Sequence, residues 1–144
     1  MAEHHDATPR PLPAPTEISR PFWDAAAEGR LEMQVCDACH AYVWTPRARC
    51  YECGSDVLTW CRLSGSGEVF SFTVIRQVAG RGASAYFTEQ IPYVLALIEL
   101  DEGPRMLAQV TGCDVDKVAI GMKLRVRFER VSSDICLPCF EPAL

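Results

Sequence analysis

The sequence contains few histidines, and this scarcity limits the chemistry open to it. The three histidines are His4, His5 and His40. His4 and His5 lie in a polar N-terminal stretch, where we interpret them as tail residues, and His40 directly follows a cysteine pair. A Ser-His-Asp triad or a Cys-His pair therefore has no histidine to use as its base. We expect no catalytic residues in this chain.

Basic residues are also scarce. The chain has fourteen lysines and arginines and nineteen aspartates and glutamates, which gives a formal net charge of −5 and a pI near 5.2. Only Arg125 and Arg127 lie close together on a predicted strand. Because binding to phosphate backbones depends on clustered positive charge, the composition argues against a nucleic-acid partner.

Long hydrophobic runs and export signals are absent from the sequence. No apolar run approaches the roughly 18 residues that span a bilayer, so we expect no membrane partner. The start, Met-Ala-Glu-His-His-Asp, has neither the basic nor the apolar region of a secretory signal. We therefore expect a cytoplasmic protein, and in that reducing compartment closely spaced cysteines bind metal more often than they form disulfides.

Cysteine is abundant, with eight in 144 residues. Two Cys-x2-Cys pairs stand ten residues apart: Cys36, Cys39, Cys50 and Cys53. Each pair lets one tight turn direct two sulfurs at a single ion, and two such turns complete a tetrahedron. The spacing predicts one structural Zn²⁺ per chain, since four thiolates leave no position for a reactive water. Iron in a rubredoxin-like Cys₄ site is the alternative.

The other four cysteines do not suggest a second metal site. Cys136 and Cys139 have the spacing of a third Cys-x2-Cys pair, but the sequence has no fourth pair with which they could form a second metal site. We predict packed thiols at these two positions. Cys61 and Cys113 lie in or beside predicted strands, where a free cysteine behaves as a small apolar residue.

The first sixty residues predict an arm, a helix and a ribbon. Four prolines, at positions 9, 11, 13 and 15, predict a flexible arm over 1–17. A helix is predicted over 19–29, with Ser19 as its cap and Gly29 as its stop. A short strand over 31–35 leads into the cysteine pairs, so 18–60 forms the helix and zinc-ribbon domain.

The rest of the chain predicts a barrel. Five segments rich in β-branched and aromatic residues are separated by turn signals: 57–63, 68–78, 93–100, 105–111 and 123–131. Five strands suit an OB-fold barrel, assigned to 61–144. The predicted fold is therefore mainly β, an N-terminal helix plus rubredoxin-like zinc ribbon followed by a five-stranded OB-fold barrel. The longest loop, 79–92, presents Tyr86 and Phe87, which we expect to be exposed.

An ordered set of short motifs resembles one known family. The set runs from about residue 18 to the C-terminus and comprises Phe22-Trp23, Glu28-Gly-Arg-Leu31, the two cysteine pairs with Pro46-Arg47 between them, Gly65-Ser-Gly-Glu-Val69, Pro92-Tyr93, Glu99-Leu-Asp-Glu-Gly103, Gly121-Met122 and Pro138-Cys-Phe-Glu-Pro142. It resembles the acyl-CoA-associated zinc-ribbon/OB-fold family, first described as domain of unknown function thirty-five.

The resemblance implies an accessory subunit with no active site of its own. Members of this family stand beside thiolase-fold enzymes, such as thiolases, acyltransferases and side-chain aldolases, that act on CoA thioesters. They dock the catalytic partner and help to enclose the CoA substrate. By analogy with the family, a thiolase-fold dimer carrying one copy of this chain on each side would form a two-plus-two hetero-oligomer.

Two functional hypotheses follow. In the first, the chain is such a subunit: Arg76 and Arg81 meet the CoA phosphates, and the pantetheine lies along Tyr86 and Phe87. The alternative for both arginines is ordinary solvated surface. In the second hypothesis the chain is a free-standing OB-fold module that binds nucleic acid, which would need a basic groove with aromatic residues.

Overall fold

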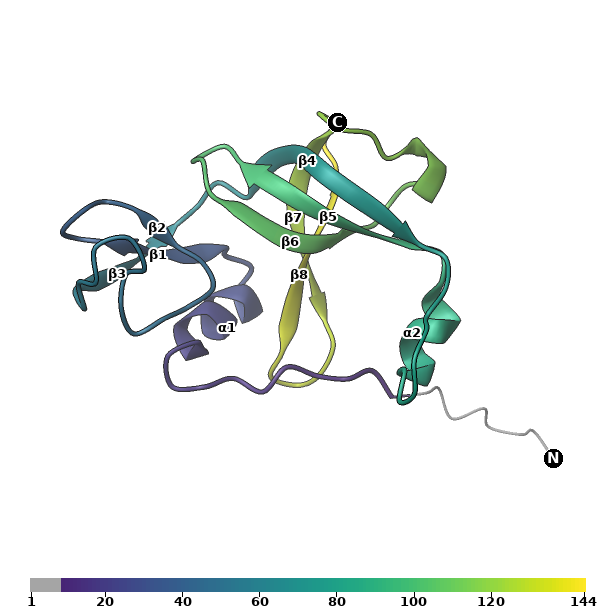
Figure 1. Cartoon of the computed structure of the whole chain (residues 1–144), viewed down its shortest axis with the longest axis horizontal. Coiled ribbons are helices and arrows are strands. Elements are labelled where there is room, and N and C mark those ends of the chain that lie inside the picture. Colours follow the sequence, from purple (N-terminus) through teal and green to yellow (C-terminus); the bar gives the residue numbers. More distant parts are fainter. Residues whose placement is uncertain (1–8) are drawn as a thin grey trace.

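The computed structural model describes residues 9–144, so His4 and His5 lie outside the described part of the chain. One helix, a three-stranded sheet and a closed barrel follow one another along the sequence (Figure 1). This order confirms the predicted fold class. Neither helix in residues 9–144 is long and apolar enough to cross a membrane.

Helix α1, Arg20–Ala27, begins and ends inside the predicted range. Pro21 lies in its first turn, and Gly29, with φ +79°, ends it in the left-handed conformation that favours glycine. Ser19 occupies the predicted N-cap position, but its hydroxyl makes no capping hydrogen bond to the helix. Its hydroxyl oxygen instead accepts a hydrogen bond from the Thr16 N–H at 2.9 Å, outside the helix. Phe22 and two alanines of α1 are buried.

The zinc-ribbon sheet has the strand order β2-β1-β3, and both pairings are antiparallel. Its strands are β1 Glu32–Cys36, β2 Tyr42–Val43 and β3 Leu58–Arg62. The turn between β1 and β2 carries the first cysteine pair, and the connection from β2 to β3 carries the second. The sheet thus brings the two pairs to the same end of the ribbon.

The barrel closes in the order β4-β5-β6-β8-β7. Its strands are β4 Ser66–Ile75, β5 Tyr93–Leu100, β6 Arg105–Val110, β7 Lys123–Arg130 and β8 Cys136–Pro142, with a short 3₁₀ helix, Val115–Lys117, between β6 and β7. Strand β4 pairs with both β5 and β7, and Gly67 lies where the two pairings overlap. A Cβ at Gly67 would lie 2.5 Å from the Glu99 carbonyl oxygen, so only glycine allows this close approach.

Two strand assignments made from the sequence need correction. The segment predicted over 57–63 is β3, which pairs with β1 in the ribbon and not with the barrel. The fifth barrel strand is β8, which was not predicted. Pro138 and the Cys-x2-Cys spacing obscure the sequence pattern of this strand. On the side that faces β6, β8 is paired only at Phe140. That largely free edge accommodates a proline, which has no N–H to donate.

One hydrophobic core joins the helix, the ribbon and the barrel. Alternate residues of β5 point inward, so that Val94, Ala96, Ile98 and Leu100 are buried. Phe140 is fully buried among them, and the same cluster includes residues of α1 and β1. The ribbon is therefore packed against the barrel and is not an independent appendage.

The long loop between β4 and β5 contains a helix that was not predicted, α2, Ala85–Gln90. Tyr86 and Phe87 lie on it and are half-buried, so the prediction that they are exposed is wrong. Their rings contact each other edge to face with centroids 5.3 Å apart, and Phe87 also contacts the Tyr93 ring. These aromatic contacts hold α2 against the start of β5.

Candidate functional site

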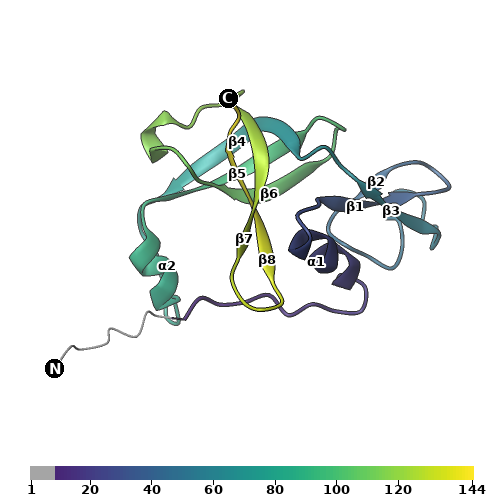
Figure 2. The same cartoon turned by 180° about the vertical axis from the view of Figure 1, so that it is seen from behind.

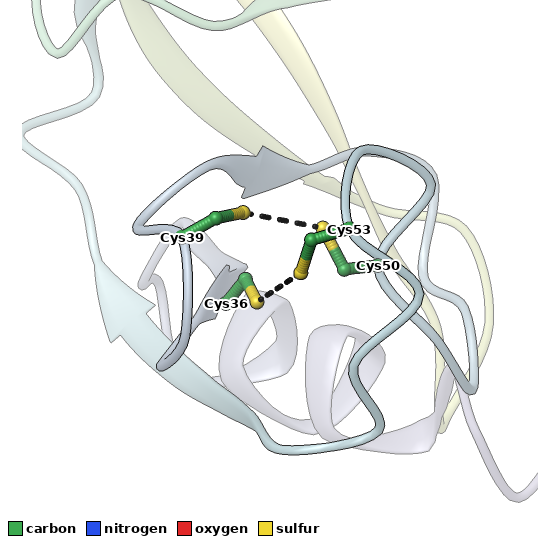
Figure 3. A group of neighbouring side chains, drawn as sticks. All are labelled: Cys36, Cys39, Cys50 and Cys53. Carbon is green, nitrogen blue, oxygen red and sulfur yellow. Dashed lines mark hydrogen bonds between the residues drawn. The ribbon is translucent and has the colours of Figure 1, made fainter.

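The structure brings the four predicted metal ligands together. The sulfurs of Cys36, Cys39, Cys50 and Cys53 all lie within 4.8 Å of one another (Figure 3). The Cys36 and Cys53 sulfurs are 3.5 Å apart, and those of Cys39 and Cys50 are 3.6 Å apart. One residue of each pair is buried and the other is exposed, so the cluster lies just below the surface of the ribbon.

The two cysteine pairs form matching turns. In the first, His40 has φ +63° and its N–H donates to the Cys36 carbonyl at 2.8 Å. In the second, Gly54 has φ +78° and its N–H donates to the Cys50 carbonyl at 2.9 Å. Each turn needs a left-handed residue directly after its second cysteine. His40 supplies that conformation in the first turn.

The electrostatics of the cluster favour a cation. The backbone N–H groups of Cys39 and Ala38 lower the pKa of Cys36 to about 6. The pKa of Cys39 instead rises to about 12: the Ala41 N–H acts to lower it, but partial desolvation of the sulfur within the cluster and its contacts with the neighbouring thiols outweigh that effect. Four thiolates so close together repel one another unless a divalent ion lies between them. A Cys₄ donor set without an open position fits a structural Zn²⁺.

Gln34 holds the segment between the two cysteine pairs, a role that sequence reasoning missed. It is the one buried polar side chain among the described residues. Its amide nitrogen donates to the Arg47 carbonyl at 3.0 Å, and its amide oxygen accepts from the Arg47 N–H at 2.8 Å. A buried amide satisfied at both ends fixes the loop that carries Cys50 toward the cluster.

The four residues proposed for CoA do not all meet in one place. Tyr86 and Phe87 lie side by side on α2. Arg76 forms an ion pair with Asp116 at 2.8 Å, and Arg81 is exposed, with no polar contact to the described residues. Neither arginine lines the hollow beside Phe87 described next.

A hollow of about 300 Å³ lies on the outside of the barrel beside α2. Its wall is formed by side chains of β5, β6, β7 and β8 together with α2 and the N-terminal segment: Arg10, Phe87, Tyr93, Leu95, Gln109, Glu129, Leu137, Pro138 and Cys139. The outer face of the second and third barrel strands, here β5 and β6, is where OB folds bind ligands. Arg10 was not predicted for this site, because nothing in a proline-rich tail indicates a distant contact.

The predicted burial of Cys136 and Cys139 is correct. Both are buried on β8. The Cys139 thiol donates to the Arg127 carbonyl at 3.4 Å and accepts from the Thr111 hydroxyl at 3.9 Å. Burial raises the pKa of Cys139, so the thiol stays protonated and packed.

Two families of known domains match successive parts of the chain. Residues 23–59 match the rubredoxin-like zinc ribbon domain of ChsH2, and residues 60–129 match the C-terminal OB-fold domain of ChsH2. The boundary between the two matches falls within β3, at the junction of ribbon and barrel. The chain therefore contains a zinc ribbon domain whose four cysteine sulfurs lie close together.

Whole proteins from several organisms are similar to this chain. A probable enoyl-CoA hydratase alpha subunit of Thermomonospora curvata is 32% identical over 135 residues, which cover 94% of this chain and 40% of that protein. This chain thus spans less than half the length of that relative. A DUF35 domain-containing scaffold protein of Methanothermobacter thermautotrophicus is 31% identical over 120 residues, covering 83% of this chain and 86% of that protein.

A solved structure supports the same relationship. A chain of the Ltp2-ChsH2(DUF35) aldolase superimposes with a TM-score of 0.77 at 31% identity, covering 92% of this chain and 100% of that one. The similarity extends over both the ribbon and the barrel. This chain accordingly belongs to the DUF35 family of zinc-ribbon and OB-fold proteins.

Proposed function

We propose that this chain is a non-catalytic, zinc-binding subunit of a thiolase-like or aldolase-type complex that acts on acyl-CoA thioesters. The proposal rests on the similarity of this chain to a chain of the Ltp2-ChsH2(DUF35) aldolase, 100% of which is covered by the match. The name of the Thermomonospora curvata relative, a hydratase alpha subunit, also points to CoA thioesters and to a multi-subunit enzyme. The chemistry would then belong to the partner.

The chain's part in such a complex is to dock the partner and help to enclose the CoA. The aromatic residues Tyr86 and Phe87 stand beside the hollow on the OB ligand face, where a pantetheine arm would find apolar walls. Arg76 and Arg81 remain proposals for the phosphates. Arg76 would have to exchange its partner Asp116 for a phosphate, a contact of the kind that arginine favours.

We further propose one structural Zn²⁺ per chain, a thiolase-fold partner and a two-plus-two assembly in the cytoplasm. The cytoplasmic location agrees with four cysteines outside the metal cluster that carry no disulfide. We assign 1–17 to the arm, 18–60 to the helix and ribbon, and 61–144 to the barrel. A nucleic-acid module is not favoured, because Arg125 is paired with Glu141 at 2.9 Å and Lys123 with Glu68.

The proposal predicts a specific partner. The tagged chain, expressed in its native host, is expected to co-purify with a thiolase-fold protein and to carry about one zinc per chain. Mass spectrometry of the eluate identifies the partner, and elemental analysis of the same sample identifies the metal. The tag alone, expressed in parallel, is the control. Zinc without a partner would contradict the subunit proposal, and iron would instead support the rubredoxin-like alternative.

A further inference from the structure

The segment over residues 9–15 lies against the barrel although it cannot pair with it. Prolines at positions 9, 11, 13 and 15 have no N–H to donate, and no backbone hydrogen bond joins this segment to the rest of the described chain. Figures 1 and 2 show it as an extended purple chain that runs from near α2, across the tip of the β7–β8 hairpin, to α1. We call residues 9–15 the strap.

The strap borders three hollows, of which two adjoin on the outer face of the barrel and the third, lined by Leu12 and Pro15, is more polar. Arg10 lines the hollow beside Phe87. Pro13 and Ala14 line a second, more apolar hollow of about 420 Å³ between α1, the ribbon and the barrel. These two adjoining hollows share Leu137 and Pro138 of β8. The strap therefore runs beside Leu137 and Pro138 along the face on which OB folds bind ligands.

A single side chain provides the polar attachment of the strap. The Arg10 guanidinium donates to the Tyr86 hydroxyl at 3.1 Å and lies over the Tyr86 ring, 5.2 Å from its centroid. The same group lies 3.7 Å from the Glu129 carboxylate, and the Arg10 side chain is only 18% exposed. No other residue from 9 to 15 has a polar contact within the described chain. Arg10 thus joins the strap to α2 and β7.

We propose that the strap is a detachable cover of the OB ligand face, with Arg10 as its latch. Proline-rich chain is already extended when free, so docking costs it little conformational entropy, and undocking breaks no backbone hydrogen bond. The cover opens when Arg10 leaves Tyr86 and Glu129. Acyl-CoA is the ligand whose access the strap controls, and this part of the inference rests on the proposed function.

Cys139 reports the opening, because this residue lines the same hollow as Arg10 and is only 3% exposed. Cys136 is the internal control: it is 5% exposed on the same strand but lines none of the three hollows. The full-length, zinc-loaded chain is treated with iodoacetamide, and peptide mass spectrometry follows the labelling rate of each cysteine. Arg10→Ala is expected to raise the rate at Cys139 about tenfold, the size expected from losing one charge-assisted contact.

Arg62→Ala is the matched control, since Arg62 is an exposed arginine of β3 that lines no hollow bordered by the strap. Tyr86→Phe removes the hydroxyl acceptor without removing a wall of the hollow, and we expect a smaller rise at Cys139. The proposed role of the strap would be contradicted if the labelling rate of Cys139 were unchanged in both Arg10→Ala and Tyr86→Phe. Equal increases in the labelling rates of Cys136 and Cys139 would contradict it as well. The labelling needs no partner or CoA, so its failure is distinguishable from failure of the proposed function.

Discussion

Replacing Cys36 by serine is expected to abolish stoichiometric metal binding and to unfold the ribbon sheet. Cys36 is fully buried at the end of β1, so no surface water can take the place of its sulfur as a metal ligand. Structural zinc contributes roughly 10–16 kcal/mol of apparent binding free energy in small zinc modules, and without it such modules are unfolded. The barrel has its own closed hydrogen-bonded sheet and is expected to remain folded.

Elemental analysis and amide hydrogen exchange measure the two effects in the Cys36→Ser variant. Zinc is expected to fall far below one per chain, and protection is expected to vanish over β1 to β3 while β5 and β7 stay protected. Cys61→Ser is the control, because Cys61 is a half-buried cysteine of β3 outside the cluster. Full zinc content with a protected ribbon in Cys36→Ser would show that the metal site has been misassigned.

The Phe140→Ala variant is expected to lose about 3–5 kcal/mol of unfolding free energy, the cost of removing a large buried aromatic ring. Phe140 is fully buried in the shared core. It also provides the one pairing between β6 and β8, through which the barrel closes. The cavity left behind would therefore lie at the point where the sheet is least connected.

Urea denaturation followed by tryptophan fluorescence measures this loss. Leu107→Ala serves as the control, since Leu107 lies on β6 with 62% of its surface exposed, and exposed substitutions usually change stability by less than about 0.5 kcal/mol. A loss below about 1 kcal/mol in Phe140→Ala would mean that the barrel does not depend on the β6–β8 closure.

The metal cluster and most strands could be predicted because their signals are local. A Cys-x2-Cys turn is fully encoded in a few residues, and the structure places all four sulfurs together as expected. The segments over 93–100 and 105–111 are rich in apolar residues and bounded by turn signals, and β5 begins and ends as predicted. Local composition and turn signals were sufficient for these elements.

The features that were missed depend on contacts between distant residues. Whether 57–63 joins the ribbon or the barrel is decided by its pairing with β1, which its own sequence does not reveal. Pro138 obscures the strand pattern of β8. The glycines of the β4–β5 loop made the segment that forms α2 resemble a loop. Arg10 meets Tyr86 across 76 residues of sequence, so its role as a latch becomes visible only in the folded chain.

Reconstitution of activity shows whether this chain is a non-catalytic subunit of an acyl-CoA enzyme. The partner recovered by co-purification, this chain, and the two mixed are assayed separately for conversion of an acyl-CoA thioester. We expect the mixture to be at least about tenfold more active than the partner alone, and this chain alone to have no activity. Turnover by this chain alone, or a partner that is equally active without it, would contradict the claim that it is a non-catalytic subunit of an acyl-CoA enzyme.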